Sequence, residues 1–153
     1  MIIQEDTRQQ AGKHELKHQW FEAHGVELVR CKLPFGDYAP VPPVAVDTKK
    51  GLDEIAANIC GKEHTRFINE CKAAKAAECQ LIILVENDVD ISDISQVHTW
   101  VNPRAIYSDR CVQGPRLQKA METIQERYGT KFLFCRPEET GEIIKGIIEH
   151  GNE

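Results

Sequence analysis

Hydrophobic residues follow a period of two in some segments and a period near 3.6 in others, so strands and helices alternate along the chain. The segments with a strand pattern are 2–6, 26–33, 44–49, 81–86 and 131–135. The segments with helical spacing are 13–23, 52–59, 63–78, 114–128 and a last helix that opens at Pro137. Residues 88–112 show no clear period and are expected to be irregular. Alternating strands and helices indicate an α/β sheet.

Length and composition are ordinary for a globular protein. The 153 residues are 41% hydrophobic and 28% charged, and a chain of this size buries roughly 68–70% of its unfolded surface. We therefore expect a single domain over residues 1–153. The longest aliphatic run, 81–85, is far shorter than the ~20 apolar residues that cross a bilayer. Charged residues interrupt the first ten positions, so no signal peptide is expected, and we predict a cytoplasmic protein without a membrane segment.

The net charge and the cysteine positions limit the binding partners and the cross-links that we expect. The net charge is −5, and all of it falls in residues 77–153 because residues 1–76 are balanced. An acidic total argues against tight nucleic-acid binding, although a bound divalent metal would make its surroundings more positive. The six cysteines include no C-x-x-C pair. We expect reduced, mostly buried thiols rather than disulfides or a zinc ribbon.

A possible zinc motif lies early in the chain. His14, Glu15 and His18 fit H-E-x-x-H, and His24 stands where a third zinc ligand would follow. A zinc hydrolase is therefore one alternative. Against it, Phe21 occupies the position where that pattern needs glycine, and few residues precede the motif. We favour an amphipathic surface helix that carries its basic and histidine residues on the solvent side.

A second group of residues is more informative. Asp37 lies in a G-D-Y turn, and Asp47 and Lys49 follow on the strand 44–49. Side chains at i and i+2 share one face of a strand, so Asp47 and Lys49 point the same way as Ala45, whereas Thr48 points to the opposite face. If the intervening proline-rich turn, residues 40–43, returns this strand beside Asp37, two carboxylates and an ammonium converge.

Such a group suits metal-assisted hydrolysis of a phosphodiester. A carboxylate pair with waters holds Mg²⁺. The cation lowers the pKa of bound water and neutralises a phosphate oxygen, and a lysine beside it orients water or stabilises the developing charge. The alternative is plain: both Asp37 and the D-x-K triplet can be ordinary solvated charges, because short motifs recur by chance.

The first half of the chain resembles the nuclease domain of the XPF family of structure-specific endonucleases, a branch of the PD-(D/E)XK superfamily, most closely its small prokaryotic and phage type. The matching segments are 2–10 (family D-T-R-E-Q), 33–38 (L-x-x-G-D-Y), 46–53 (V-E-R-K-x-x-x-D), 66–70 (R-F-x-x-E) and the strand 81–86. The resemblance covers residues 2–86 and implies a restriction-endonuclease-like core, a central mixed sheet flanked by helices. Residues 87–153 would complete the sheet and helices.

The resemblance also implies roles for individual residues. Asp37 and Asp47 would be metal ligands, Lys49 the catalytic lysine, and Asp6 a catalytic group at the edge of the site. The basic residues expected to contact DNA are Arg8, Lys50, Lys62 and Arg66. The acids expected just behind the metal ligands are Asp53 and Glu70, although Asp53 can equally be a partner of a helix dipole.

Three features depart from the family pattern. Gln9 replaces an acid, which removes one carboxylate from the metal site or its surroundings. Asp47 replaces glutamate, and Thr48 replaces an arginine that would point away from the site. The paired helix-hairpin-helix motifs that many members use to hold DNA are absent from these residues.

The resulting prediction is a Mg²⁺- or Mn²⁺-dependent DNA endonuclease that acts at branched or junction DNA, with a homodimer or a partner subunit supplying further affinity. The alternative is a degenerate nuclease fold that binds DNA or serves as a partner subunit. Trp100, in the irregular segment, is interpreted as an aromatic residue packed on the domain, with a base-stacking platform as its alternative.

Overall fold

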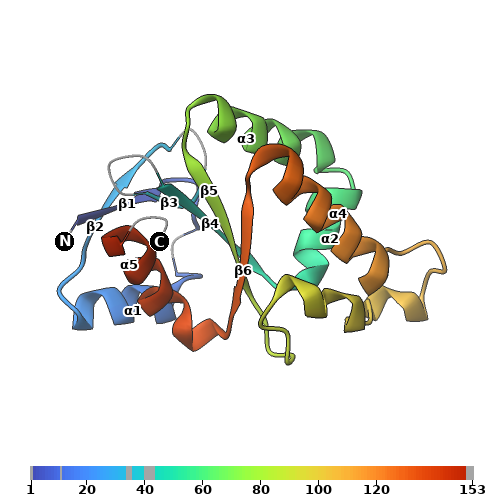
Figure 1. The fold of residues 1–153 in the computed structure, drawn as a ribbon. Helices are drawn as coiled ribbons and strands as arrows, with labels where there is room; N and C mark the ends of the chain where they lie inside the picture. Colours follow the sequence, from blue (N-terminus) through green and yellow to red (C-terminus); the bar gives the residue numbers. More distant parts are fainter. Residues whose placement is uncertain (1, 11, 34–35, 40–43, 151–153) are drawn as a thin grey trace.

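Six strands form one mixed sheet in the computed structural model, which describes residues 2–10, 12–33, 36–39 and 44–150 (Figure 1). The strands are β1 (Ile2–Asp6), β2 (Glu27–Cys31), β3 (Tyr38–Ala39), β4 (Val44–Lys50), β5 (Gln80–Glu86) and β6 (Lys131–Cys135), in the order β2-β1-β3-β4-β5-β6. β1 and β2 are parallel, as are β4, β5 and β6, whereas β3 runs antiparallel to both of its neighbours. The predicted mixed sheet is therefore confirmed. The proline-rich turn at 40–43 lies outside the described residues.

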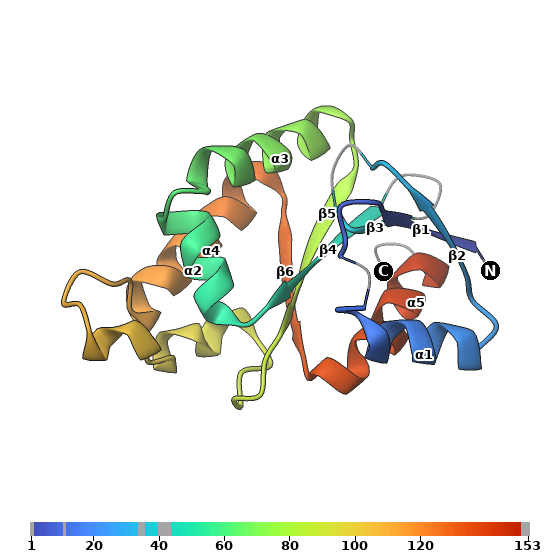
Figure 2. The same cartoon turned by 180° about the vertical axis from the view of Figure 1, so that it is seen from behind.

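Helices cover both faces of the sheet (Figures 1 and 2). The helices are α1 (Glu15–Ala23), α2 (Leu52–Cys60), α3 (His64–Ala76), α4 (Gly114–Tyr128) and α5 (Thr140–His150). One hydrophobic cluster joins α2, α3 and α4 to one face, and a second joins α1 and α5 to the other. The helix predicted to open at Pro137 begins with the short 3₁₀ turn η3 (Pro137–Glu139) and continues as α5.

Alternation along β4 and β5 explains this two-sided core. Ala45 on β4 and Ile83 on β5 belong to the α2–α4 side, whereas Val46 and Ile82 belong to the α1–α5 side. Strands buried on both faces are hydrophobic almost throughout, and β4 is such a strand until Asp47. The change from apolar to charged residues within β4 places the candidate chemistry at the end of a rigid central strand.

The helix α1 differs from its prediction. Lys17 is only 3% exposed, because its Nζ lies 2.7 Å from Glu86 Oε1 at the end of β5. The expectation that all basic residues of this helix face solvent was wrong for Lys17. The sequence of α1 contains no sign of this pairing, since the partner comes from a strand that ends sixty-nine residues later.

The three histidines of the zinc motif have separate partners. His14 accepts a hydrogen bond from Lys17 Nζ, and His18 Nε2 lies 2.5 Å from Glu5 Oε2. His24 stacks on Trp20 with ring centroids 3.7 Å apart. Among the described residues, no group of three or more His, Cys, Asp or Glu side chains converges closely enough to hold a metal ion by itself.

The segment expected to be irregular contains two short 3₁₀ helices, η1 (Ile94–Thr99) and η2 (Pro103–Ile106). Each begins where a side chain caps the first turn: Asp93 accepts from Ser95 N, and Asn102 accepts from Arg104 N. Such short turns have no strong hydrophobic period, so the pattern analysis missed them. In the part of the chain that the structure describes, no helix is both long and apolar enough to span a bilayer.

Candidate active site

Charged side chains gather around a cavity of about 700 Å³ beside β4 and α3. Six acids line it, namely Asp6, Asp37, Asp47, Glu54, Glu63 and Glu70. Three basic residues line it as well, namely Arg8, Lys49 and Arg66. We call this hollow the acidic cavity, because its carboxylates outnumber its cations two to one.

Asp47 and Lys49 reach the acidic cavity from the same face of β4, as their spacing predicts. Asp47 is 4% exposed, and its Oδ1 lies 3.3 Å from Lys49 Nζ. This contact is an ion pair rather than a well-aligned hydrogen bond, and Asp47 Oδ1 has no hydrogen-bond partner among the described residues. A buried carboxylate oxygen without a hydrogen bond is costly, so this atom is suited to receive an additional cationic ligand.

Asp37 is placed by backbone hydrogen bonds on both sides. Its N–H donates to Val46 O and its carbonyl accepts from Asp6 N, each at 2.7 Å. Gly36 before it has φ +76°, and a Cβ there would lie 3.2 Å from Ala45 Cβ. Only glycine adopts this conformation and this close approach without strain, which explains the G-D-Y order at the site.

Thr48 has a role that the strand pattern did not predict. Its backbone N–H and its Oγ1 both donate to Asp37 Oδ2, at 2.6 and 3.1 Å. Thr48, placed on the opposite face of β4 by its spacing, therefore still contacts a candidate metal ligand. The alternation of β4 is intact, but Asp37 curves around the strand and its carboxylate meets Thr48. These two bonds orient one oxygen of Asp37.

Glu70 joins the same group from α3. Its Oε1 accepts from Gly36 N at 2.8 Å, so it also supports the turn that carries Asp37. Burial, followed by the nearby charge of Asp47, raises the pKa of Glu70 to about 7. A carboxyl group with such a pKa is partly protonated near pH 7, and a bound cation would favour its ionised form.

Asp37 and Lys49 are shifted by the same surroundings. Burial and the charge of Asp47 raise the pKa of Asp37 well above its usual range. Burial alone would lower the pKa of Lys49, but the carboxylates of Asp47 and Asp37 outweigh it, so the pKa is raised and the ammonium stays charged. Lys49 therefore lies among three carboxyl groups, and the acids of the acidic cavity outnumber its basic residues.

These residues fit a divalent metal ion. A hard cation prefers carboxylate and water oxygens. Asp47 Oδ1 is an acceptor without a hydrogen bond in the described residues, and burial followed by the charge of Asp47 raises the pKa values of Asp37 and Glu70. Since three protein side chains do not converge closely enough in the described residues, the ion would rely on Asp37 and Asp47 with water or substrate oxygens.

Asp6 has a different environment from the other acids. It is 2% exposed, and its carboxylate accepts from Leu33 N and from the Arg8 side chain. Arg8 in turn donates to Leu33 O at 2.9 Å. Asp6 lines the acidic cavity, but its oxygens are already bonded, so its carboxylate mainly joins the ends of β1 and β2.

The other sequence-predicted residues divide into two groups. Arg66 lines the acidic cavity and is 75% exposed at its side chain, with an ion pair to Glu63. Lys50 and Asp53 line a neighbouring cavity instead. Lys62, in the turn between α2 and α3, is exposed and lines neither of them. Asp53 is therefore separate from the metal-ligand candidates.

Three further residues line the acidic cavity. Gln9, which stands where the family has an acid, lies 3.5 Å from Thr48 Oγ1 through its Nε2. Glu54 and Asn58 come from α2, one helical turn apart, and Asn58 Nδ2 donates to Glu54 O. Their i, i+4 spacing on a helix directly after the D-x-K strand was the signal that could have identified them.

Comparisons with known proteins give one family match and similar solved structures. The model of the ERCC4 domain matches residues 6–147. Two solved structures are similar, XPF from Aeropyrum pernix and the same protein in complex with DNA. Each has a TM-score of 0.70 and 20% identity, and each alignment covers 97% of this chain. The chain spans 64% and 63% of those two structures, which is less than two thirds of their length. A search of curated proteins found no match.

Proposed function

The chain belongs to the ERCC4 domain family, and from this premise we propose that it is a DNA endonuclease that hydrolyses phosphodiester bonds with Mg²⁺ or Mn²⁺. The observation that carries the proposal is the convergence of Asp37, Asp47 and Lys49 in one cavity. These are the residues for which the XPF-family resemblance implies metal binding and catalysis. The resemblance in fold supports the same assignment.

Each residue has a distinct part in the proposed reaction. Asp37 and Asp47 would hold the ion, which supplies a Lewis acid that activates water and neutralises phosphate charge. Lys49 Nζ, next to Asp47, is placed to stabilise negative charge on a phosphate oxygen. Thr48 keeps Asp37 in one orientation through two hydrogen bonds. Glu70 holds the Gly36 turn on which Asp37 depends.

Electrostatics suggest how DNA is bound. Without a metal the acidic cavity would repel a polyanion, so metal loading and DNA binding should be coupled. Arg66, exposed at the cavity rim, and Arg8 would contact phosphates. Two phosphate contacts are few, and the net charge of −5 adds no long-range attraction to DNA. We therefore propose that a second copy or a partner subunit supplies the remaining affinity for branched or junction DNA.

A degenerate, non-cleaving fold is the second candidate. Gln9 in place of an acid favours it, because the acidic cavity has one carboxylate fewer than the family pattern. Asp6, whose oxygens are bonded to Leu33 N and Arg8, cannot easily replace that carboxylate. Such a protein would bind DNA or an active subunit without hydrolysis.

Cleavage assays separate the two candidates. Flapped, forked, nicked and fully duplex DNA are incubated with Mg²⁺ or Mn²⁺ and with wild type, Asp47→Asn and Lys49→Ala. The nuclease proposal expects cleavage by wild type at a junction, and a loss of about a hundredfold or more in both variants. The degenerate alternative expects equal, background cleavage by all three proteins.

Matched control variants remove one charge of the same kind elsewhere. Asp109→Asn and Lys72→Ala alter exposed residues that line neither cavity, so they should cleave as wild type does. If they lose as much activity as Asp47→Asn and Lys49→Ala, total charge rather than the acidic cavity governs the rate, and the site assignment is wrong.

A further inference from the structure

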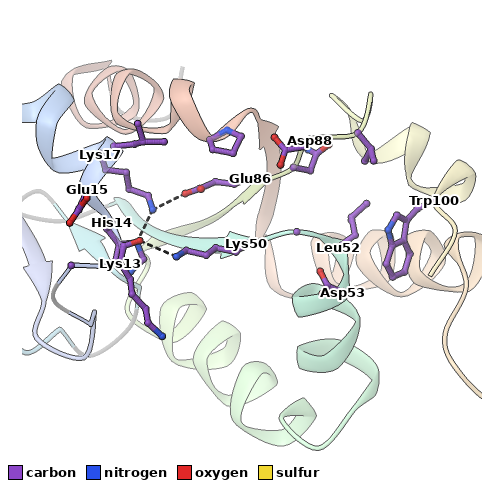
Figure 3. Close-up of a pocket in the computed structure, with 16 residues that line it drawn as sticks. Lys13, His14, Glu15, Lys17, Lys50, Leu52, Asp53, Glu86, Asp88 and Trp100 are labelled. Carbon is purple, nitrogen blue, oxygen red and sulfur yellow. Dashed lines mark hydrogen bonds and ion pairs between the residues drawn. The ribbon is translucent and has the colours of Figure 1, made fainter. Parts of the chain in front are cut away.

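A second cavity of about 580 Å³ lies next to the acidic one, at the carboxyl ends of β4 and β5 (Figure 3). Lys49 lines the acidic cavity and Lys50, the next residue, lines this second cavity. Ligands of open α/β sheets usually bind beyond the carboxyl ends of strands, and this volume is within the range of small-molecule sites. The second cavity is not used by the proposed catalytic residues.

One end of the second cavity carries three lysines together with Glu15 and Glu86. Lys13, His14, Lys17 and Lys50 lie together there in Figure 3. Lys17 is already paired with Glu86, whereas Lys50 Nζ donates one hydrogen bond, to Lys13 O at 3.0 Å. An ammonium has three N–H donors. Lys50 therefore retains donors that can reach a phosphate group.

The opposite end carries Trp100 and Leu52, with Asp53 next to them. The Trp100 indole lies beside Leu52 in Figure 3. Val89 also lines the second cavity. Trp100 is half-buried: it packs on the α2–α4 core while part of the ring faces the second cavity. Its backbone N–H donates to Val97 O at 2.9 Å, and its side chain packs on that core. A tryptophan held in this way offers a flat surface for a planar ligand.

Hydrogen-bond acceptors also line the second cavity. Asn87, 8% exposed, donates through Nδ2 to Ile91 O at 3.0 Å, and its Oδ1 has no hydrogen-bond partner in the described part of the chain. Asp88 and Asp53 also line the second cavity. A planar ligand that brings amino groups would satisfy such acceptors, as carboxylate and amide oxygens accept from the exocyclic amino groups of bases.

We infer that the second cavity binds one unpaired nucleotide of the DNA strand, with an amino-bearing base on Trp100 and its phosphate at Lys50. The inference deepens the proposed function and depends on it for the source of the nucleotide. A duplex keeps its bases stacked, so only a strand that is unpaired next to the cleavage site can enter. The structure thereby gives a physical basis for a preference for junctions over plain duplex.

Tryptophan fluorescence tests the inference directly. The chain has two tryptophans, so Trp20→Phe leaves Trp100 as the only emitter while an aromatic ring stays at position 20. This protein is titrated with dC10, dT10, free dCMP and a blunt duplex, with thermal unfolding as the check on its fold. We expect dC10 to quench the emission with an affinity at least fivefold above that for dT10, which lacks an amino group. Duplex should not quench.

Two substitutions at Trp100 provide an independent measurement by fluorescence anisotropy of labelled dC10. Trp100→Leu removes the stacking surface and should weaken binding about tenfold, whereas Trp100→Phe should stay within about threefold. Equal affinities of wild type and Trp100→Leu, or equal quenching by dC10 and dT10, would overturn the inference. Binding of dCMP as tight as that of dC10 would show a free-nucleotide site instead of a strand site.

The same proteins distinguish this inference from the nuclease proposal. Quenching by dC10 without cleavage of any junction would leave the second cavity as a single-strand site in a protein that is not a nuclease. Junction cleavage without quenching would leave the endonuclease and exclude the nucleotide site.

Discussion

The two cavities beside the end of β4 differ in how their buried charges are balanced. In the acidic cavity, three basic residues face six acids, and burial followed by the charge of Asp47 raises the pKa values of Asp37 and Glu70. In the second cavity, Lys17 Nζ lies 2.7 Å from Glu86 Oε1, so the two charges of this pair balance, although Oε1, like Asp47 Oδ1, has no aligned hydrogen bond in the described residues. The protein thus compensates one cavity internally and leaves the other dependent on an external cation.

This difference distinguishes charged residues that support the fold from charged residues that serve a ligand site. A buried pair that is complete within the chain contributes to the folded state when both partners are present. A buried cluster with surplus charge destabilises the folded state until a ligand arrives, and such clusters are typical of active sites. Substitutions in the two cavities should therefore have opposite effects on stability.

The largest expected effect is on the Lys17–Glu86 pair. Lys17→Met leaves Glu86 buried without its partner, so the free energy of unfolding should fall by about 3–5 kcal/mol. The double variant Lys17→Met/Glu86→Leu should recover most of that loss. Urea unfolding at pH 7 measures both. A small effect of Lys17→Met alone would mean that Glu86 is compensated elsewhere.

Substitution in the acidic cavity should separate activity from stability. Asp47→Asn is expected to reduce cleavage about a hundredfold or more, while the metal-free protein unfolds at an equal or higher temperature, because repulsion with Asp37 and Glu70 is relieved. Scanning calorimetry in EDTA is the measurement. A clear loss of stability in Asp47→Asn would contradict the view that this charge is uncompensated.

Divalent metal should stabilise the wild type through the same residues. At an Mg²⁺ or Mn²⁺ concentration a hundred times the dissociation constant, the free energy of unfolding should rise by about 2.7 kcal/mol. Asp47→Asn should lose most of this gain, whereas Lys17→Met should keep it, since Lys17 lies outside the acidic cavity. An equal metal effect in both variants would place the ion elsewhere.

The smallest expected effect concerns pH. Partial burial, followed by the charges of Lys17 and Lys50, lowers the pKa of His14 to about 4. Between pH 6.5 and 4 the unfolded state then binds more protons than the folded state, so stability falls as the pH falls. Solvent screens this half-buried ring, and we expect a contribution of about 1 kcal/mol. Urea unfolding of His14→Gln across this range should show a flatter dependence than wild type.

Much of the fold could be predicted because it follows from local pattern. The strands at 2–6, 44–49, 81–86 and 131–135 agree closely with β1, β4, β5 and β6. β3 was missed, since two residues are too few to show a period. The shared face of Asp47 and Lys49 was also predictable, because alternation along a strand is strict.

What could not be predicted depends on contacts between distant segments. Thr48 was assigned correctly to the opposite face of β4, but its contact with Asp37 depends on how the Gly36 turn folds over the strand. Lys17 meets Glu86 because α1 crosses the end of β5. Trp100 was interpreted as packed, and its second role at a cavity wall becomes visible only with the neighbouring Leu52 in place.

Asp37 has one more property, which follows from its backbone. The two parallel halves of the sheet, β1–β2 and β4–β6, are joined through β3, and Asp37 immediately precedes that strand. Its carbonyl is bonded to Asp6 and its N–H to Val46, so a residue proposed to hold the metal also links the two halves. Metal binding at Asp37 should therefore slow hydrogen exchange at the amides of Asp6 and Asp37. Exchange at these two positions of the sheet would then report whether the ion is bound.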